Sequence, residues 1–364
     1  MNITVVGAGV IGCAVARELA SRGARVQLID PRGAGRGATY ASAGILAPHI
    51  ESQSSSFLRL ASCSLSMWDE FIQRLHVDSG QRVDYDRSGT LQVALDSTQA
   101  AALEAMAQSL KSSHVACSLL DAREARQLEP ALTSSSMTAL LLPSHGYVAS
   151  PLLVAALIEV LSRTGVPLTA TRVVHLHDGD HDAEVMTEGG AIRSDAVVIA
   201  AGSWSTELFG TSAPRAIKPI RGQLVRLTLD QRPASRVVWS DDCYVVPWRD
   251  GTVLVGATVE DVGFAEHTTA DGVQRLLKAA AELMPLLREA RFEDARAGLR
   301  PKTADELPAI GRSSTMPHVF YAAGHYRNGV LLAPVTASLV ADLVLSGQAD
   351  PLLDAVNPGR FVSR

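Results

Sequence analysis

The chain has 364 residues, a formal net charge of -5 at neutral pH and 47% hydrophobic residues. This length exceeds that of one typical domain, so we expect two domains, each around a packed core. The mild charge, without long basic runs, argues against nucleic-acid binding. No apolar run reaches the ~20 residues that span a bilayer, so we expect no integral membrane segment and a cytoplasmic location.

The first thirty residues follow a strand–turn–helix–strand pattern. Ile3–Val6 is a short β-branched run that indicates a buried strand, and Val10–Arg22 carries apolar residues at helical spacing. A second apolar strand, Arg25–Ile29, ends at Asp30. This order of elements is typical of a nucleotide-binding unit.

Three glycines in G-x-G-x-x-G order join the first strand to the helix. Gly7 allows the tight turn, Gly9 lets a pyrophosphate approach the backbone, and Gly12 lets the helix pack on the strand. The N–H groups and dipole at the helix N-terminus would attract the phosphates. Asp30 can accept hydrogen bonds from both ribose hydroxyls, which favours FAD or NAD over NADP.

The segment that follows favours a flavin. Gly33–Leu46 is rich in small residues and would let the backbone lie against a flat ring system; a flexible loop is the alternative interpretation. His49 and Glu51 come next and could line an entrance, although a solvated loop is the simpler interpretation for both.

Between the two ends of the chain the pattern becomes antiparallel. Gln223–Leu229 and Cys243–Val246 are predicted strands, and a hairpin turn leads to the next strand, Thr252–Val255. Thr98–Lys111 and Asp271–Met284 are predicted helices. We expect a meander with one face available to cover a ligand.

The C-terminal part repeats the strand–turn–helix order. Val319–Ala323 is a predicted buried strand, Gly324–Gly329 a turn, and Val330–Leu345 an apolar helix. The N-terminus of such a helix would stabilise the negative charge of a reduced flavin ring.

The four cysteines form no CxxC motif, and no histidine cluster completes a zinc site. We therefore expect reduced thiols and no metal. The cysteines are Cys13, Cys63, Cys117 and Cys243.

Four stretches together resemble the D-amino acid oxidase superfamily of FAD-dependent oxidoreductases, and the glycine oxidases most closely. They are the glycine fingerprint with Ala41–Leu46, then Val198–Ser205, Gly298–Gly311 and Ala322–Pro334. They run from residue 3 to the C-terminal helix, so the resemblance covers essentially the whole chain.

The resemblance implies an α/β fold. A discontinuous Rossmann-like FAD-binding domain would comprise 1–80, 142–214 and 296–364. A substrate domain with an antiparallel β-sheet flanked by helices would comprise 81–141 and 215–295.

It also implies non-covalent FAD, because Gly298 stands where related sarcosine oxidases hold flavin through a cysteine. A backbone contact from Val173 to the adenine is implied within the predicted strand Thr171–His175, with plain sheet core as the alternative. The residues expected at the cofactor are Gly7, Gly9, Val10, Ile11, Gly12, Asp30, Pro31, Ala38, Thr39, Ala43, Gly44, Ile45, Val173, Gly202, His325, Tyr326, Arg327, Asn328, Gly329, Val330 and Leu331.

Amino acid oxidation in such enzymes moves a hydride from Cα to flavin N5, and the resulting imine hydrolyses. The protein must hold Cα about 3–3.5 Å from N5, and an Arg fork suits the substrate carboxylate. The resemblance selects Arg300 as this anchor, Tyr244 as a second carboxylate ligand and Arg327 as a further active-site group. For Tyr244 a packed strand aromatic is the alternative.

The function implied by the resemblance is oxidative deamination of glycine or another small amine or D-amino acid. The products would be an oxo acid (glyoxylate from glycine) and ammonia, with O2 reoxidising the flavin to give H2O2, and glycine oxidases often serve thiamine biosynthesis. A D-amino acid or sarcosine-type dehydrogenase with another acceptor is the alternative. An NAD-dependent dehydrogenase would need a second fingerprint, which is not found. Assembly into a homo-oligomer is left open.

Overall fold

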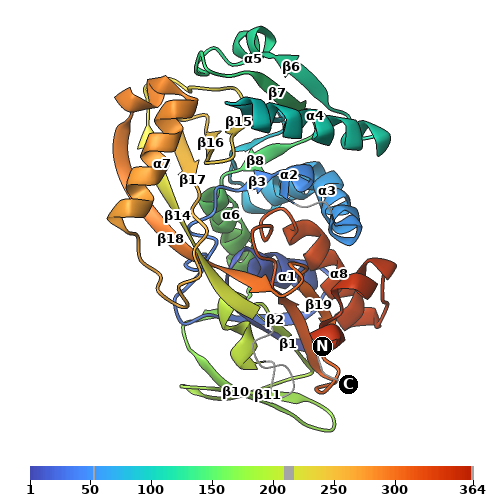
Figure 1. Ribbon diagram of the computed structural model, residues 1–364. Helices are drawn as coiled ribbons and strands as arrows, with labels where there is room; N and C mark the ends of the chain where they lie inside the picture. The colour runs from blue at the N-terminus through green and yellow to red at the C-terminus, as the bar shows by residue number, and fades with distance from the viewer. Residues whose placement is uncertain (52–53, 209–216, 362–364) are drawn as a thin grey trace.

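The computed structural model describes residues 1–51, 54–208 and 217–361. It has an α/β architecture built on two large β-sheets (Figure 1). Within the described residues no helix combines the length and apolar character needed to cross a bilayer.

The first sheet has six strands in the order β19, β20, β13, β1, β2 and β9. Neighbours pair in parallel except the edge strand β19, which runs antiparallel to β20. The central strands β1, β13 and β20 are almost entirely buried and largely apolar, as expected for a parallel sheet covered on both faces. Their bounds are Asn2–Val6 (β1), Arg25–Ile29 (β2), Leu168–Thr169 (β9), Ala196–Ile199 (β13), Ala309–Arg312 (β19) and Val319–Ala323 (β20).

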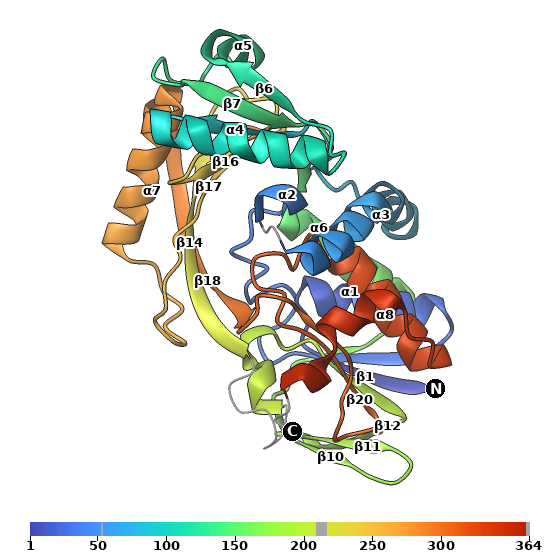
Figure 2. The ribbon, with the colours of Figure 1, turned by 45° about the vertical axis from the view of Figure 1, so that its right-hand side comes forward.

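The two faces of this sheet are covered differently (Figure 2). Helices cover one face and share its main apolar core, whereas a small antiparallel sheet covers the other. The helices are α1 (Val10–Ser21), α3 (Ser55–Ser79), α6 (Ser150–Arg163) and α8 (Ala333–Ser346), and the small sheet is β10 (Val173–Asp178), β11 (Ala183–Thr187) and β12 (Gly190–Ser194).

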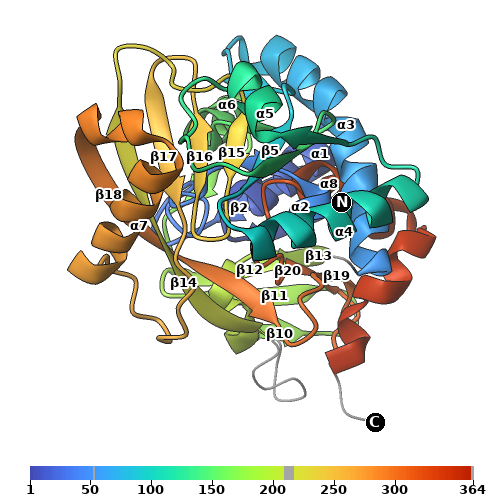
Figure 3. The same cartoon turned by 45° about the horizontal axis from the view of Figure 1, so that its top comes forward.

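The second large sheet has eight strands in the order β18, β14, β17, β16, β15, β5, β7 and β6. All neighbours are antiparallel except β15 and β5. Helix α7 packs against β14 and β17 (Figure 3). The bounds are Thr90–Ala94 (β5), Ser118–Asp121 (β6), Thr138–Leu142 (β7), Ile217–Thr228 (β14), Val237–Trp239 (β15), Tyr244–Pro247 (β16), Thr252–Gly256 (β17), Arg291–Thr303 (β18), Ser97–Ser112 (α4), Ala122–Leu128 (α5) and Ala270–Leu283 (α7).

Short elements join the two sheets. A three-stranded sheet, in the order β3, β8 and β4, lies where the chain passes from one large sheet to the other. The bounds are Ile45–Leu46 (β3), Tyr85–Asp86 (β4), Gly146–Val148 (β8), Pro48–Glu51 (α2), and the 3-10 helices Gly202–Leu208 (η1), Pro285–Glu289 (η2), Pro351–Val356 (η3) and Pro358–Phe361 (η4).

The predicted domain boundaries stay a proposal: 1–80, 142–214 and 296–364 on one side, 81–141 and 215–295 on the other. The six-stranded sheet falls within the first group, whereas β18 crosses the boundary at residue 296. The boundary at residue 214 lies outside the described residues.

Most predicted elements are confirmed to within one residue, including α1, α4, α7 and β20. Three differ. The predicted strand Gln223–Leu229 is the second half of a longer strand, Ile217–Thr228. The predicted strand Thr171–His175 begins at Val173 and runs to Asp178. The predicted helix Val330–Leu345 begins at Ala333, because residues 330–332 form a turn and Pro334 occupies the first helical turn, where proline is favoured.

Candidate active site

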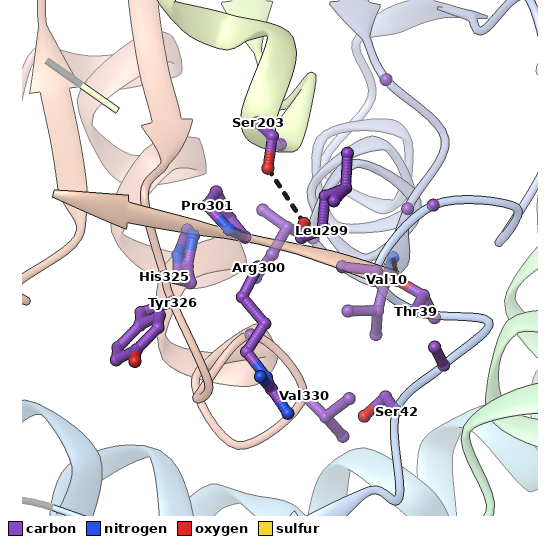
Figure 4. Close-up of a pocket in the computed structure, with 18 of the residues that line it drawn as sticks. Val10, Thr39, Ser42, Ser203, Leu299, Arg300, Pro301, His325, Tyr326 and Val330 are labelled. Atoms are coloured by element: carbon purple, nitrogen blue, oxygen red, sulfur yellow. Dashed lines mark hydrogen bonds between the residues drawn. The ribbon is translucent and has the colours of Figure 1, made fainter. Parts of the chain in front are cut away.

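A cavity of about 430 Å³ lies between the two large sheets and is lined by residues of both. Residues after β1 and β2 line one end, and residues of β16, β17 and β18 line the other. Ser203 Oγ donates to the Leu299 carbonyl at 2.9 Å, which ties the turn after β13 to β18 beside the cavity (Figure 4).

Two of the three fingerprint glycines are required by packing, and the third borders open space. A Cβ at Gly7, whose φ is +105°, would lie 2.3 Å from the Ala200 carbonyl oxygen, and one at Gly12 would lie 1.8 Å from the Gly7 carbonyl oxygen. Both positions therefore require glycine for packing. A Cβ at Gly9 would meet only Thr39 Oγ1, at 3.4 Å, although Gly9 lines the cavity, so the space beside it is open to a ligand.

The N-terminus of α1 offers hydrogen-bond donors to this space. The Val10 N–H donates to Thr39 Oγ1 at 3.1 Å, whereas the N–H groups of Gly9 and Ile11 meet no protein acceptor in the part of the chain that the structure describes. Unpaired N–H groups at a helix N-terminus suit a phosphate. The residues present therefore fit a pyrophosphate.

Two backbone N–H groups hold the Asp30 carboxylate in place. Its Oδ2 accepts the Ala8 N–H at 2.9 Å and its Oδ1 accepts the Arg32 N–H at 2.8 Å. Each carboxylate oxygen keeps a further lone pair, so Asp30 can also accept from the two hydroxyls of a ribose.

The small residues after Asp30 form one wall. Gly44 has a φ of +70°, and a Cβ there would lie 1.8 Å from the Val148 carbonyl oxygen, so this wall packs tightly on β8. A Cβ at Gly298 would lie 2.9 Å from Ala41 Cβ and 3.2 Å from Ala38 Cα. Gly298 therefore packs closely behind this wall, which Ala38 and Ala41 line on the cavity side.

The turn before α8 provides a second set of donors. The N–H groups of Gly329, Val330 and Leu331 have no protein acceptor among the described residues, and Gly329 and Val330 line the cavity. Successive backbone N–H groups of this kind bind negative charge. The turn, rather than the helix N-terminus predicted here, thus presents the donors.

Two residues of this turn have fixed positions. Burial lowers the pKa of His325 to about 3, and its Nε2 lies 3.0 Å from Thr336 Oγ1, so the imidazole is neutral. Tyr326 has a φ of +48° and donates its N–H to the Pro301 carbonyl at 2.8 Å. This hydrogen bond joins the turn to β18.

Arg300 extends from β18 into the cavity, toward Val330 (Figure 4). Its Nη1 donates to the Thr258 carbonyl at 2.9 Å, and a Cβ at Gly222 on the neighbouring strand would lie 2.2 Å from its Cζ. The guanidinium is held in place across Gly222 while its remaining N–H groups can receive a carboxylate.

Tyr244 lines the same cavity from β16. Its partner in the register is Gly256, where a Cβ would lie 2.3 Å from the phenol oxygen, and the Trp239 ring lies edge-on at 5.2 Å. Arg327 is exposed and lies with its Cζ 5.2 Å from the Tyr326 ring centre. The structure thus brings Arg300, Tyr244 and Arg327 to one cavity.

Of the residues expected at the cofactor, all line the cavity except Gly12, Asn328 and Leu331. The Leu331 carbonyl accepts from Ser64 Oγ and Trp68 Nε1 at 2.6 and 3.0 Å, which fixes the turn from behind. The sequence analysis missed several lining side chains, although each lies within a few residues of an identified motif: Arg32, Ser203, Trp204, Trp239, Asp241 and Asp242.

The interpretation of His49 as part of a solvated loop or entrance is wrong. His49 is 8% exposed, and its Nδ1 lies 2.9 Å from Nε2 of His145, whose Nδ1 contacts Thr90 Oγ1 at 2.8 Å. Burial lowers the pKa of both histidines, so the pair is neutral and structural. The side chain of Glu51 lies outside the described residues.

All four cysteines are free, and Cys243 lines the cavity. Burial raises the pKa of Cys243 to about 11, so it is a thiol and a poor nucleophile. Among the described residues no group of three His, Cys, Asp or Glu is placed to hold a metal ion.

Comparison with known proteins identifies the family of this chain. A family described as FAD dependent oxidoreductase (DAO) matches residues 2–343. The chain is 33% identical to the bifunctional protein ThiO/ThiG of Synechocystis sp., over 100% of this chain and 54% of that protein, so it spans about half the length of that relative. It is 33% identical to the glycine oxidase of Geobacillus kaustophilus, over 94% of this chain and 92% of that one.

The crystal structure of the glycine oxidase from Geobacillus kaustophilus has the same fold, with a TM-score of 0.94 at 31% identity over 100% of this chain and 98% of that chain. The expected α/β fold is therefore confirmed. The chain belongs to the DAO family of FAD-dependent oxidoreductases.

Proposed function

We propose that this protein oxidises the Cα–N bond of glycine or another small amino acid. The observation that carries the proposal is the placement of Arg300 and Tyr244 on the cavity that Gly329 and Val330, with their unpaired N–H groups, also line. One set suits a substrate carboxylate and the other suits the negative charge of a reduced flavin.

FAD would be held by the α1 N-terminus at its pyrophosphate, by Asp30 at its ribose and by the wall of small residues along its ring. When bound, it supplies the acceptor for the hydride from Cα. We propose non-covalent binding, because Gly298 packs against Ala38 and Ala41 and the Cys243 thiol stays protonated.

Arg300 would bind the substrate carboxylate with the N–H groups that do not contact Thr258. Because Nη1 is tied to the Thr258 carbonyl, the guanidinium enters the interaction already oriented, which limits the entropy lost on binding. Tyr244 would donate its hydroxyl to the same carboxylate, and Arg327 would add positive charge near the ring. No acid–base pair is required if the amine enters neutral.

The complete reaction would convert glycine, O2 and water into glyoxylate, ammonia and H2O2. A role in thiamine biosynthesis is part of the proposal and is supported by the similarity to the ThiO/ThiG relative. A cytoplasmic location is also part of the proposal. We propose a small amino acid as the substrate and O2 as the acceptor.

The test is a substrate panel of glycine, sarcosine, D-alanine and L-alanine, with oxygen uptake and peroxide measured on the purified yellow protein. We expect one peroxide per oxygen with glycine or a close analogue and none with L-alanine. Substrate-dependent reduction of an artificial dye without peroxide would instead identify a dehydrogenase, and no turnover of any amine would contradict the proposal.

A further inference from the structure

The loop of residues 257–269, between β17 and α7, reaches from the second large sheet to the first. At its tip the Phe264 ring lies 5.6 Å from the Trp204 ring, and Glu266 Oε2 lies 2.6 Å from Arg32 Nη1. The Arg32 guanidinium in turn lies 4.3 Å over the Trp204 ring. The tip thus holds two side chains that line the cavity, Arg32 and Trp204.

Those two side chains mark the adenosine end of the cavity. Arg32 follows Asp30 by two residues, and Trp204 follows Gly202 by two; Val173 lines the same cavity. The Arg32 guanidinium and the Trp204 indole contact each other and form part of the cavity wall at this end. Phe264 and Glu266 of the loop contact these two side chains without lining the cavity themselves.

The root of the loop is rigid. Arg221 and Glu260 exchange backbone hydrogen bonds at 2.8 and 2.9 Å and also form an ion pair with Arg221 only 5% exposed. The fully buried Gln223 side chain donates to Glu260 Oε1 at 2.7 Å and accepts the Thr269 N–H at 2.7 Å. The loop is therefore fixed near its start, at Glu260, and at its end, at Thr269.

The tip is held more weakly than the root. Phe264 is 50% exposed, and the side chains of the Arg32–Glu266 pair are 37% and 24% exposed. Partly exposed ion pairs and ring contacts of this kind contribute little each. The contacts of the tip are therefore weaker than the buried hydrogen bonds and ion pair of the root.

We propose that loop 257–269 is a clasp that retains FAD. Phe264 and Glu266 keep Trp204 and Arg32 over the adenosine end, and the cofactor leaves only after the tip releases them. The inference rests on FAD occupying this cavity, as in the proposed function, and it adds a contribution of the second sheet to cofactor retention.

The test measures FAD release after dilution of the holoenzyme, followed by flavin fluorescence, for Phe264→Ala and Glu266→Gln. Matched controls are Phe292→Ala, on β18 and 52% exposed, and Glu159→Gln, whose ion pair with Arg163 lies on α6. We expect release about three- to tenfold faster for the first clasp variant and about two- to fivefold for the second, with the controls unchanged.

Salt and turnover separate the clasp from other roles. The difference between Glu266→Gln and the unaltered protein should disappear at 1 M salt, where the Debye length is about 3 Å. Turnover at saturating FAD should stay unchanged in both variants. Equal release rates for clasp variants and controls would overturn the clasp, as would lost turnover without faster release, whereas a protein that binds no FAD would overturn the proposed function instead.

Discussion

Replacing Gly222 with alanine tests the position of the Arg300 guanidinium without removing it. The new Cβ would lie 2.2 Å from Cζ and from Nη2 of Arg300, whereas ordinary carbon contacts need 3.4 Å or more. The guanidinium must therefore move by about 1 Å, and a misplacement of that size costs about 100-fold in catalysis. The strand itself is spared, since the contact is with the far end of a long side chain.

The assay is steady-state kinetics with glycine, together with the FAD content and Tm of the purified variant. We expect kcat/KM to fall about 100-fold, with KM rising, while FAD content and Tm stay close to those of the unaltered protein. Gly189→Ala is the matched control, because a Cβ there meets nothing closer than 3.7 Å. Normal kinetics in Gly222→Ala would refute the placement of the guanidinium as the substrate anchor.

Three further predictions concern charge. Arg300→Ala should lower kcat/KM for glycine by at least about 100-fold and leave FAD bound, since an unpaired charge in a desolvated site costs ~2–5 kcal/mol; unchanged kinetics would contradict this. Because burial lowers the pKa of His145 below its ordinary 6.5, the unfolded chain binds a proton that the folded chain does not. Tm should therefore fall as pH drops below 6.5. If Tm fell equally steeply with pH in the His145→Gln variant, His145 would not be the cause of the pH dependence. Glu129 is 1% exposed and pairs with Arg236 at 2.7 Å, so Glu129→Gln should reduce the free energy of unfolding by about 3 kcal/mol in urea titrations, a value that a loss below 1 kcal/mol would disprove.

The nucleotide end was predictable because its signals are local. Gly7 and Gly12 are required by backbone packing at the two ends of the fingerprint, Gly9 borders the cavity between them, and Asp30 follows the next strand. Periodicity likewise located β1, α1 and β20. The helix start at Ala333 was missed because apolar residues occupy both the turn and the helix, and Pro334 was the one signal of the boundary.

The substrate end depended on contacts between distant residues. Arg300 was proposed as the anchor through resemblance, but its packing across Gly222 follows from the pairing of β14 with β18, which sequence spacing does not reveal. His49 was misjudged for the same reason, because its partner His145 lies 96 residues away. Glu266 and Arg32 are 234 residues apart in the sequence, and the residues around each of them gave no indication of their contact.

The most direct measurement is anaerobic mixing of the purified holoenzyme with glycine in a stopped-flow spectrophotometer. We predict that glycine bleaches the flavin absorbance at a rate that rises to a maximum as the glycine concentration increases. The Arg300→Ala variant should need a far higher glycine concentration to reach its half-maximal rate. Persistent yellow colour under nitrogen, with FAD bound and glycine or its small analogues in excess, would contradict the assignment of this cavity to amino acid oxidation.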